Sequence, residues 1–258
     1  MVKHGKRLGV TQIFILGDLT DQKDNHSSRL VNRVVSELRL LSRVAPVHVL
    51  KGNHDYIEES APFFQFLSNL KGVRFYNKVS EVEIEGLSFL MLPHSRKLYR
   101  RGHQFMVNTK GFDRVLFHFP LSGSEGSNGR PVPGGVDRKI FAKCKLAIGG
   151  DIHVPQRIGS AIYVGAPYPI HMGDCYRPRV LVDDGKVLRS LYRSTLKKVM
   201  VCIRSVDELR SLDLSSGDQI KVTYELPRTE FHEWPAVRTA IQRWCEEEQV
   251  ILRGLSAR

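Results

Sequence analysis

The feature that most constrains the fold of this chain is a repeated one: a short apolar run that stops at glycine or at a residue able to bind metal. The runs lie at residues 13–16 (IFIL), 46–50 (PVHVL), 115–119 (VLFHF) and 145–150 (KLAIGG). Short apolar runs bounded by glycine are typical of buried strands in a parallel sheet. Because the carboxyl ends of such strands share one edge of the sheet, we expect side chains distant in sequence to converge there.

Between the first two runs, residues 30–41 (LVNRVVSELRLL) place leucine and valine at helical spacing, after candidate caps that include Ser27. Strand, helix and strand in this order predict a right-handed crossover unit. Residues 81–92 predict a hairpin that turns at Gly86. These elements together predict an α/β fold.

The pattern changes after residue 193, where short strands and helices alternate in a compact series. We therefore expect two domains, a larger one over residues 1–193 and a small α/β domain over residues 194–258. The Gly-, Ser- and Pro-rich stretch at residues 121–135 is expected to be a flexible surface loop.

Composition narrows the class of protein. Hydrophobic residues make up 41% and charged residues 26% of the 258 residues, as in soluble globular proteins. No apolar stretch reaches the roughly 20 residues that a membrane-spanning helix needs, and no signal-peptide pattern opens the chain, so we expect a cytoplasmic protein with no membrane partner. The four cysteines form no C-x-x-C pair, which argues against disulfides and a thiolate zinc site.

The net charge of +12 favours a polyanionic partner, nucleic acid first. Residues 186–210 are strongly basic, with Asp207 and Glu208 as the acids among them. A second basic segment interleaves cations with one aromatic ring that can stack a base. Its candidate substrate-binding residues are Arg96, Lys97, Tyr99, Arg100 and Arg101.

The strand ends carry a set of oxygen and nitrogen ligands. In chain order these are Asp18 and Asp21 in GDLTD, Asn53, His54 and Asp55 in GNHD, His118 in FHF, and Asp151 and His153 in GDIH. Mixed aspartate, asparagine and histidine ligands suit manganese, iron or zinc better than calcium.

In these motifs the chain resembles the calcineurin-like metallophosphoesterases over roughly residues 11–183, with GNHD after a buried strand as the most specific part. The resemblance implies a β-sandwich flanked by helices. The small domain and the tract IYVGAPY are similar to the cap domain and a turn of SbcD-type DNA repair exonucleases. The resemblance thus implies a metal-dependent phosphodiesterase, a DNA exonuclease or nuclease.

By position, the resemblance assigns a role to each candidate. Asp18 would bridge two divalent ions, with manganese expected first and iron, zinc or magnesium as alternatives. Asn53, His118 and Asp151 would bind the second ion and His153 the first. His54 would protonate the leaving oxygen or stabilise the transition state, and Asp55 would orient His54 through a hydrogen bond. Asp21 would have a structural role. Two ions roughly 3.5–4 Å apart neutralise the phosphoryl group and activate a water.

The chain departs from the family pattern at two places. Asp151 stands where the family has the first histidine of Gly-His-x-His; a carboxylate can still bind metal and favours harder ions such as manganese or magnesium. The family's first motif, Asp-x-His, is missing, because the 16 residues before Gly17 have no room for the roughly 30-residue unit that carries it. Our hypothesis is that the chain starts late, so that a longer chain should recover activity; without that motif the first ion keeps Asp18 and His153 alone.

Two other functions stay open at this point. One is a phosphoesterase acting on nucleotides or cyclic nucleotides. The other is a catalytically impaired module that binds nucleic acid, as the missing motif would suggest. The resemblance further implies an SMC-like ATPase as a candidate partner, and a homodimer is a second candidate assembly.

Overall fold

The structure is a computed structural model that describes residues 2–96 and 107–258. The chain divides into two compact units, residues 1–165 with 184–187 and residues 166–183 with 188–258. Among the residues that the structure describes, every helix is too short or too polar to traverse a lipid bilayer. The predicted domain boundary after residue 193 stays a prediction.

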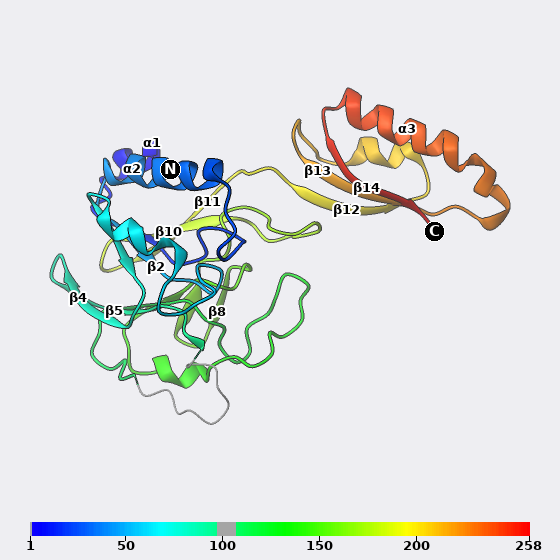
Figure 1. The fold of residues 1–258 in the computed structure, drawn as a ribbon. Coiled ribbons are helices and arrows are strands. Elements are labelled where there is room, and N and C mark those ends of the chain that lie inside the picture. The colour runs from blue at the N-terminus through cyan, green and yellow to red at the C-terminus, as the bar shows by residue number, and fades with distance from the viewer. Residues whose placement is uncertain (1, 97–106) are drawn as a thin grey trace. The chain divides into compact units, whose positions relative to one another are not determined.

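The first unit opens with a small parallel sheet in the order β1-β2-β3, whose first two strands are joined by a helical crossover (Figure 1). Its elements are α1 (Val2–Leu8), β1 (Ile13–Ile15), α2 (Ser28–Ser42), β2 (Val47–Leu50), the 3-10 helix η1 (Phe63–Asn69) and β3 (Val73–Tyr76). Ser27 caps α2, since its side chain accepts a hydrogen bond from the backbone N–H of Leu30. The predicted strand, helix and strand are therefore confirmed, while β3 was not predicted.

The second sheet of this unit has six strands in the order β4-β5-β6-β7-β9-β8. The strands are β4 (Ser80–Ile84), β5 (Leu87–Leu92), β6 (Arg114–Phe117), β7 (Ala147–Gly149), β8 (Gln156–Ile158) and β9 (Ala161–Tyr163). The four inner strands β5, β6, β7 and β9 pair in parallel, whereas β4 and β8 pair antiparallel at the edges. The predicted hairpin is β4 and β5, with positive φ at Glu85 and Gly86.

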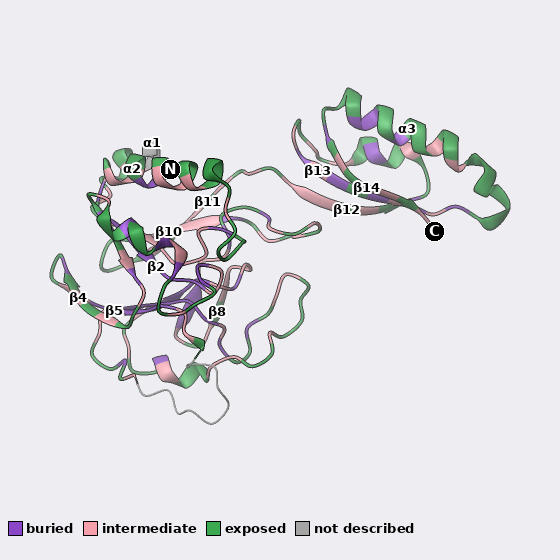
Figure 2. Cartoon of the chain, viewed as in Figure 1, coloured by how far each residue is buried: buried purple, intermediate pink, exposed green. Residues whose placement is uncertain are grey.

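The two sheets pack through their aromatic and aliphatic faces. Phe14 of β1 stacks on Phe89 of β5 with ring centroids 5.2 Å apart. Phe117 of β6 and Tyr163 of β9 are fully buried in the core of the larger sheet, whose inner strands β6, β7 and β9 consist of buried residues (purple in Figure 2). This mixed α/β architecture agrees with the predicted fold class.

The segment after β6 is more ordered than the sequence analysis predicted. Leu121 and Ser124 are both 0% exposed, and Leu121 forms a parallel bridge with Val136. Gln156 of β8 contacts Glu125 twice, accepting from its N–H at 2.9 Å and donating to its carbonyl at 2.8 Å. Backbone hydrogen bonds and two buried side chains therefore hold this stretch, despite its glycines.

The second unit contains a hairpin and a separate parallel sheet. The hairpin is β10 (Arg179–Asp183) and β11 (Leu188–Tyr192). The sheet has the order β12-β13-β14, and its strands are β12 (Lys198–Ile203), β13 (Gln219–Tyr224) and β14 (Ile251–Ala257). Helices connect these parallel strands: the 3-10 helix η4 (Val206–Ser211) follows β12, and the 3-10 helix η5 (Arg228–Glu233) and α3 (Trp234–Glu247) follow β13. Ser205 and Glu208 form a capping box at the start of η4.

Candidate metal centre

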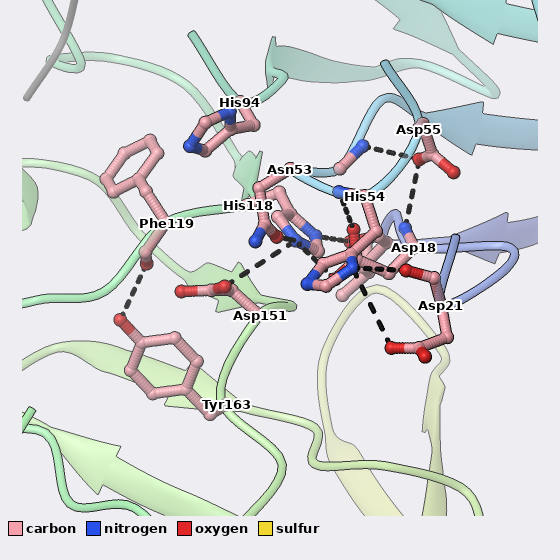
Figure 3. A network of polar contacts seen from close by, with 12 residues as sticks. Asp18, Asp21, Asn53, His54, Asp55, His94, His118, Phe119, Asp151 and Tyr163 are labelled. Carbon is pink, nitrogen blue, oxygen red and sulfur yellow. Dashed lines mark hydrogen bonds and ion pairs between the residues drawn. The ribbon is translucent and has the colours of Figure 1, made fainter. Parts of the chain in front are cut away.

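Three side chains that can bind metal converge at the carboxyl ends of strands in the first unit (Figure 3). Asp18 follows β1, His118 follows β6 and Asp151 follows β7. One ligand atom of each lies within 4.8 Å of the other two, and among the described residues this is the one such group of histidine, cysteine and acidic side chains. The structure therefore brings together three of the predicted metal ligands.

Asn53, which follows β2, lies against the same group. One end of its carboxamide lies 3.0 Å from Asp18 Oδ2, 3.0 Å from His118 Nε2 and 3.3 Å from Asp151 Oδ1. With the amide nitrogen at this end, Asn53 would donate to the two carboxylates. With the amide oxygen at this end, Asn53 adds a fourth ligand atom to those of Asp18, His118 and Asp151, and all four lie close enough to bind one cation.

The chain path at these strand ends depends on unusual backbone conformations. Asp18 has φ 53° and Asp151 has φ 73°, in the left-handed region that aspartate tolerates better than most residues. Gly52 packs so closely on Asp18 that a Cβ at position 52 would lie 2.1 Å from the Asp18 carboxylate. Glycine at position 52 therefore allows the Asp18 and Asn53 turns to touch.

His118 is held in a fixed orientation. Its side chain is 1% exposed, and its Nδ1 donates a hydrogen bond to the carbonyl oxygen of Leu16. Its Nε2 faces the two carboxylates, 3.3 Å from Asp18 Oδ2 and 3.8 Å from Asp151 Oδ1. A ring with one nitrogen bonded to a carbonyl and the other turned inward is the arrangement that metal-ligating histidines adopt.

Electrostatics at this point favours a positive charge. Burial opposes protonation of His118, but the carboxylates of Asp18 and Asp151 raise its pKa to about 9. Burial raises the pKa of Asp151. Burial also disfavours the charged form of Asp18, but the ring of His118 and the backbone N–H of His54 together outweigh burial and lower the pKa of Asp18. The same negative field that holds a proton on His118 would stabilise a divalent cation, so the donor set fits a metal ion.

His54 stands beside the group, with its side chain 37% exposed. Its backbone N–H donates to Asp18 Oδ1 at 2.8 Å, and its Nδ1 donates to the carbonyl oxygen of Asp21 at 2.6 Å. Its Nε2 lies 3.3 Å from the other end of the Asn53 carboxamide, so this nitrogen faces the metal-binding group. The Asp21 carboxylate is 99% exposed and lies 3.8 Å from the ring.

Asp55 has a different role from the one predicted. It is 0% exposed and accepts three backbone hydrogen bonds, from Gly52 at 2.6 Å, Asp18 at 3.0 Å and Leu19 at 3.1 Å. The expectation that Asp55 orients the His54 ring is corrected by these contacts, because the carbonyl of Asp21 makes that bond. Burial raises the pKa of Asp55, and the N–H bonds partly offset this. Asp55 ties the turn after β1 to the turn after β2.

The remaining predicted site residues that the structure describes do not belong to the group formed by Asp18, His118 and Asp151. His153 is half-buried, two residues after Asp151, and lies outside the group formed by Asp18, His118 and Asp151. Arg96 is exposed and donates to the carbonyl oxygen of Ile57 at 2.7 Å. Lys97, Tyr99, Arg100 and Arg101 lie outside the described residues.

The sequence analysis missed His94, which follows β5 and lies next to the centre. Its ring lies 6.4 Å from the ring of His118, edge to face. Its Nδ1 is 2.7 Å from the hydroxyl of Tyr56, a buried residue with Lys51 Nζ 4.4 Å from its ring centroid. The signal was present in the sequence, since His94 also follows an apolar run at a strand end (FLMLPH).

A model of the family described as calcineurin-like phosphoesterase matches residues 1–155, a range that includes Asp18, Asn53, His54, His118 and Asp151. A sequence comparison with curated proteins finds no match.

Proposed function

The chain belongs to the calcineurin-like phosphoesterase family, whose match covers residues 1–155 of 258, and on this premise we propose that it cleaves the phosphodiester bonds of DNA as an exonuclease or nuclease of the SbcD type. Membership makes the chain a metal-dependent hydrolase of phosphoric esters. The family generally uses a dinuclear divalent metal centre. The proposal goes further in three respects: the substrate, the metal and the residues that act.

The observation that carries the proposal is the convergence of Asp18, Asn53, His118 and Asp151 at four strand ends, with His54 beside them. These four residues would hold one divalent ion, and Asp18 with His153 would hold a second. Bound metal supplies a Lewis acid for the phosphoryl oxygens and lowers the pKa of a water. Two carboxylates and one amide oxygen favour a hard ion, and manganese is our first choice.

His54 is the proposed general acid. Asp21 engages Nδ1, so the ring presents Nε2 to the leaving oxygen of the substrate. The backbone N–H of His54 is bonded to Asp18, which couples the position of the acid to the position of the metal ligand. Asp55 would act through the chain, by holding the two turns that carry these residues together.

DNA is the proposed substrate because of charge. The net charge of +12 gives a polyanion a sequence-independent attraction, and the exposed Arg96 lies in a basic segment that follows β5. The alternative substrate, a nucleotide or cyclic nucleotide, makes few phosphate contacts. Salt dependence separates the two, since each phosphate contact of DNA releases counterions.

The test is hydrolysis of bis-p-nitrophenyl phosphate and of labelled linear DNA with manganese. Asn53→Ala and His54→Ala should each lose at least about 100-fold in kcat/KM on both substrates. Asn69→Ala and His232→Ala, which change exposed residues of the same types, should retain the activity of the parent. Parent activity that both site variants keep would refute the site assignment, and cleavage of the small ester alone would refute DNA as the substrate.

A further inference from the structure

Among the described residues, helices cover one face of the parallel sheet in the second unit. The other face carries exposed side chains and is contacted at β12, where Lys198 Nζ donates to the carbonyl oxygen of Ile170 at 2.8 Å and Met200 lies beside Gly173. Ile203, Ile220 and Val222 point from the sheet's three-stranded core toward α3 and η4, where Ile241 and Leu209 are 0% exposed. Figure 1 shows α3 running along this one face of β12, β13 and β14. Sheets made entirely of parallel strands occur almost only with both faces covered. The second face of this sheet therefore calls for an occupant.

Register defines which residues share the second face. Three rows of neighbours cross the sheet from β12 through β13 to β14: Lys198, Gln219 and Ile251; Met200, Lys221 and Gly254; Cys202, Thr223 and Ser256. A shift of register after Ile220 places Arg253 between the first two rows. We call the exposed members of this set, Met200, Cys202, Lys221, Ile251, Arg253 and Ser256, the open face.

Charge is divided between the two sides of the unit. The three strands KVMVCI, QIKVTY and ILRGLSA contain Lys198, Lys221 and Arg253 and no acidic residue. The helical segments on the other side mix both signs and are acidic in balance, with six acidic residues, Asp207, Glu208, Glu230, Glu233, Glu246 and Glu247, and four arginines, Arg210, Arg228, Arg238 and Arg243. A solvated sheet face would ordinarily mix both signs. On the side of the open face, Glu225 is the acid that follows β13, and the cations outnumber it. The open face is therefore positive in balance, which complements a polyanion.

The two exposed cations of the open face are held in place by their neighbours. The stem of Lys221 lies across Gly254, where a Cβ would stand 3.2 Å from Lys221 Cγ. Arg253 Nε donates to Gln219 Oε1 at 2.9 Å. Because Gly254 has no side chain, the side chain of Lys221 can lie against the backbone of β14. Gln219 fixes the guanidinium of Arg253 through its hydrogen bond.

Two more guanidiniums follow the strand ends at the same sheet. Arg204 Nε and Arg258 Nη2 each donate to the carboxylate of Glu225 at 2.6 Å. Each guanidinium has five N–H donors, so one bond to Glu225 leaves others for a phosphate. This pair extends the positive surface past the carboxyl ends of β12 and β14.

We propose that the open face binds the sugar-phosphate backbone of nucleic acid. The choice of nucleic acid over an acidic protein rests on the proposed function, since a phosphodiesterase of DNA must hold a polyanion. The residues of the open face include no aromatic ring, so the contacts are to phosphate and sugar and carry no base preference. Hydroxyl and ammonium donors of Ser256, Thr223 and Lys221 suit such contacts.

The test is binding of a fluorescently labelled single-stranded oligonucleotide of about 20 nucleotides, followed by anisotropy. Measurement in EDTA separates binding from hydrolysis. Lys221→Glu/Arg253→Glu should weaken binding at least tenfold and reduce the slope of log K against log salt by about 1.4, since each lost contact on a single strand is worth about 0.7. Arg238→Glu/Arg243→Glu on α3, which makes the same charge change on exposed residues, should weaken binding less than threefold.

Equal weakening by both pairs would overturn the proposal, because net charge alone would explain it. Unchanged binding in the Lys221 and Arg253 pair would also overturn it, and a change in oligomeric mass in that pair would point to a protein partner instead. Lys221→Gln/Arg253→Gln provides a milder pair if charge reversal unfolds the unit. Binding through the open face by a chain that hydrolyses neither test substrate would reject the proposed function and keep this inference.

Discussion

The Nδ1 atom of His54 donates a hydrogen bond to the backbone carbonyl oxygen of Asp21 at 2.6 Å, while the Asp21 carboxylate is 99% exposed. The ring of the proposed general acid is thus oriented by the main chain. A carbonyl oxygen cannot be removed by substitution at position 21. The side chain of Asp21 and the orientation of His54 are therefore separable by experiment.

Asp21→Ala should leave kcat/KM on bis-p-nitrophenyl phosphate within about threefold of the parent, because the carbonyl that holds His54 remains. His54→Ala should lose about 100-fold or more, the range of a general acid. Steady-state kinetics with manganese measures both. A loss in Asp21→Ala as large as in His54→Ala would mean that the carboxylate, not the carbonyl, orients the ring.

Asp55→Ala should destabilise the fold by about 3 kcal/mol or more. The substitution leaves the N–H groups of Gly52, Asp18 and Leu19 without their buried acceptor, and each bond to a charged group is worth about 1.5–3 kcal/mol. Urea unfolding followed by circular dichroism measures the change. Asp21→Ala is the matched control, since an exposed carboxylate should contribute less than about 0.5 kcal/mol. Equal stability of the two variants would disprove the link between the turns.

Asp151→His should shift the metal preference toward zinc. Imidazole in place of the carboxylate softens the donor set that Asp18, Asn53 and His118 complete, so the ratio of manganese to zinc dissociation constants should rise at least about tenfold. Titration calorimetry with each ion measures this without an activity assay. Asp24→His, at an exposed loop position, is the control. An unchanged ratio would remove Asp151 from the metal ligands.

His48 should make stability depend on pH. Burial, with a contribution from Arg74, lowers the pKa of His48 from 6.5 to about 4. His48 lies in β2, and its ring nitrogens are each 2.9 Å from a side-chain oxygen, Nδ1 from the Tyr76 hydroxyl and Nε2 from Gln12 Oε1. As pH falls from 6.5 to 4 the unfolded chain takes up this proton before the folded chain does, so the free energy of unfolding falls by up to about 3 kcal/mol. Above pH 6.5 the ring is neutral in both states and this contribution is fully present.

His48→Gln should flatten this part of the pH dependence, while His232→Gln, on an exposed histidine, should leave it as in the parent. Urea unfolding at pH 7.5 and pH 4.5 gives the two free energies for each protein. The comparison uses the difference between the two pH values, so a general loss of stability in a variant does not affect it. A parent-like difference in His48→Gln would assign the pH dependence to other groups.

The parts of the fold that the sequence predicted were those where an apolar run is followed by a glycine or by a residue able to bind metal. β1, β2, β6 and β7 are each buried or half-buried and end at such a signal, so their ends, and with them the positions of Asp18, Asn53, His118 and Asp151, could be predicted. β3 and β8 were missed because VRFY and QRI place charged or polar residues within three or four residues of strand, too short for an alternating pattern to register.

Hydrogen bonds to main-chain atoms could not be predicted from the sequence. The carbonyl oxygens of Asp21 and Leu16, which orient His54 and His118, exist at every residue and carry no side-chain signature. The order of residues 121–135 was underestimated for a similar reason, since glycine and proline mark turns without saying whether backbone bonds close them. His94, by contrast, had the same strand-end signal as His118 and could have been predicted.

The positive φ values of Asp18 and Asp151 restrict how evolution or design can alter this centre. Aspartate, asparagine and histidine are the side chains that this backbone conformation accepts most readily, apart from glycine, which carries no ligand. The residue at position 151 can therefore alternate between a carboxylate, an amide and an imidazole while the chain path stays the same. Single substitutions among these three side chains can therefore adapt the same fold to different metal ions, without a compensating change elsewhere in the fold.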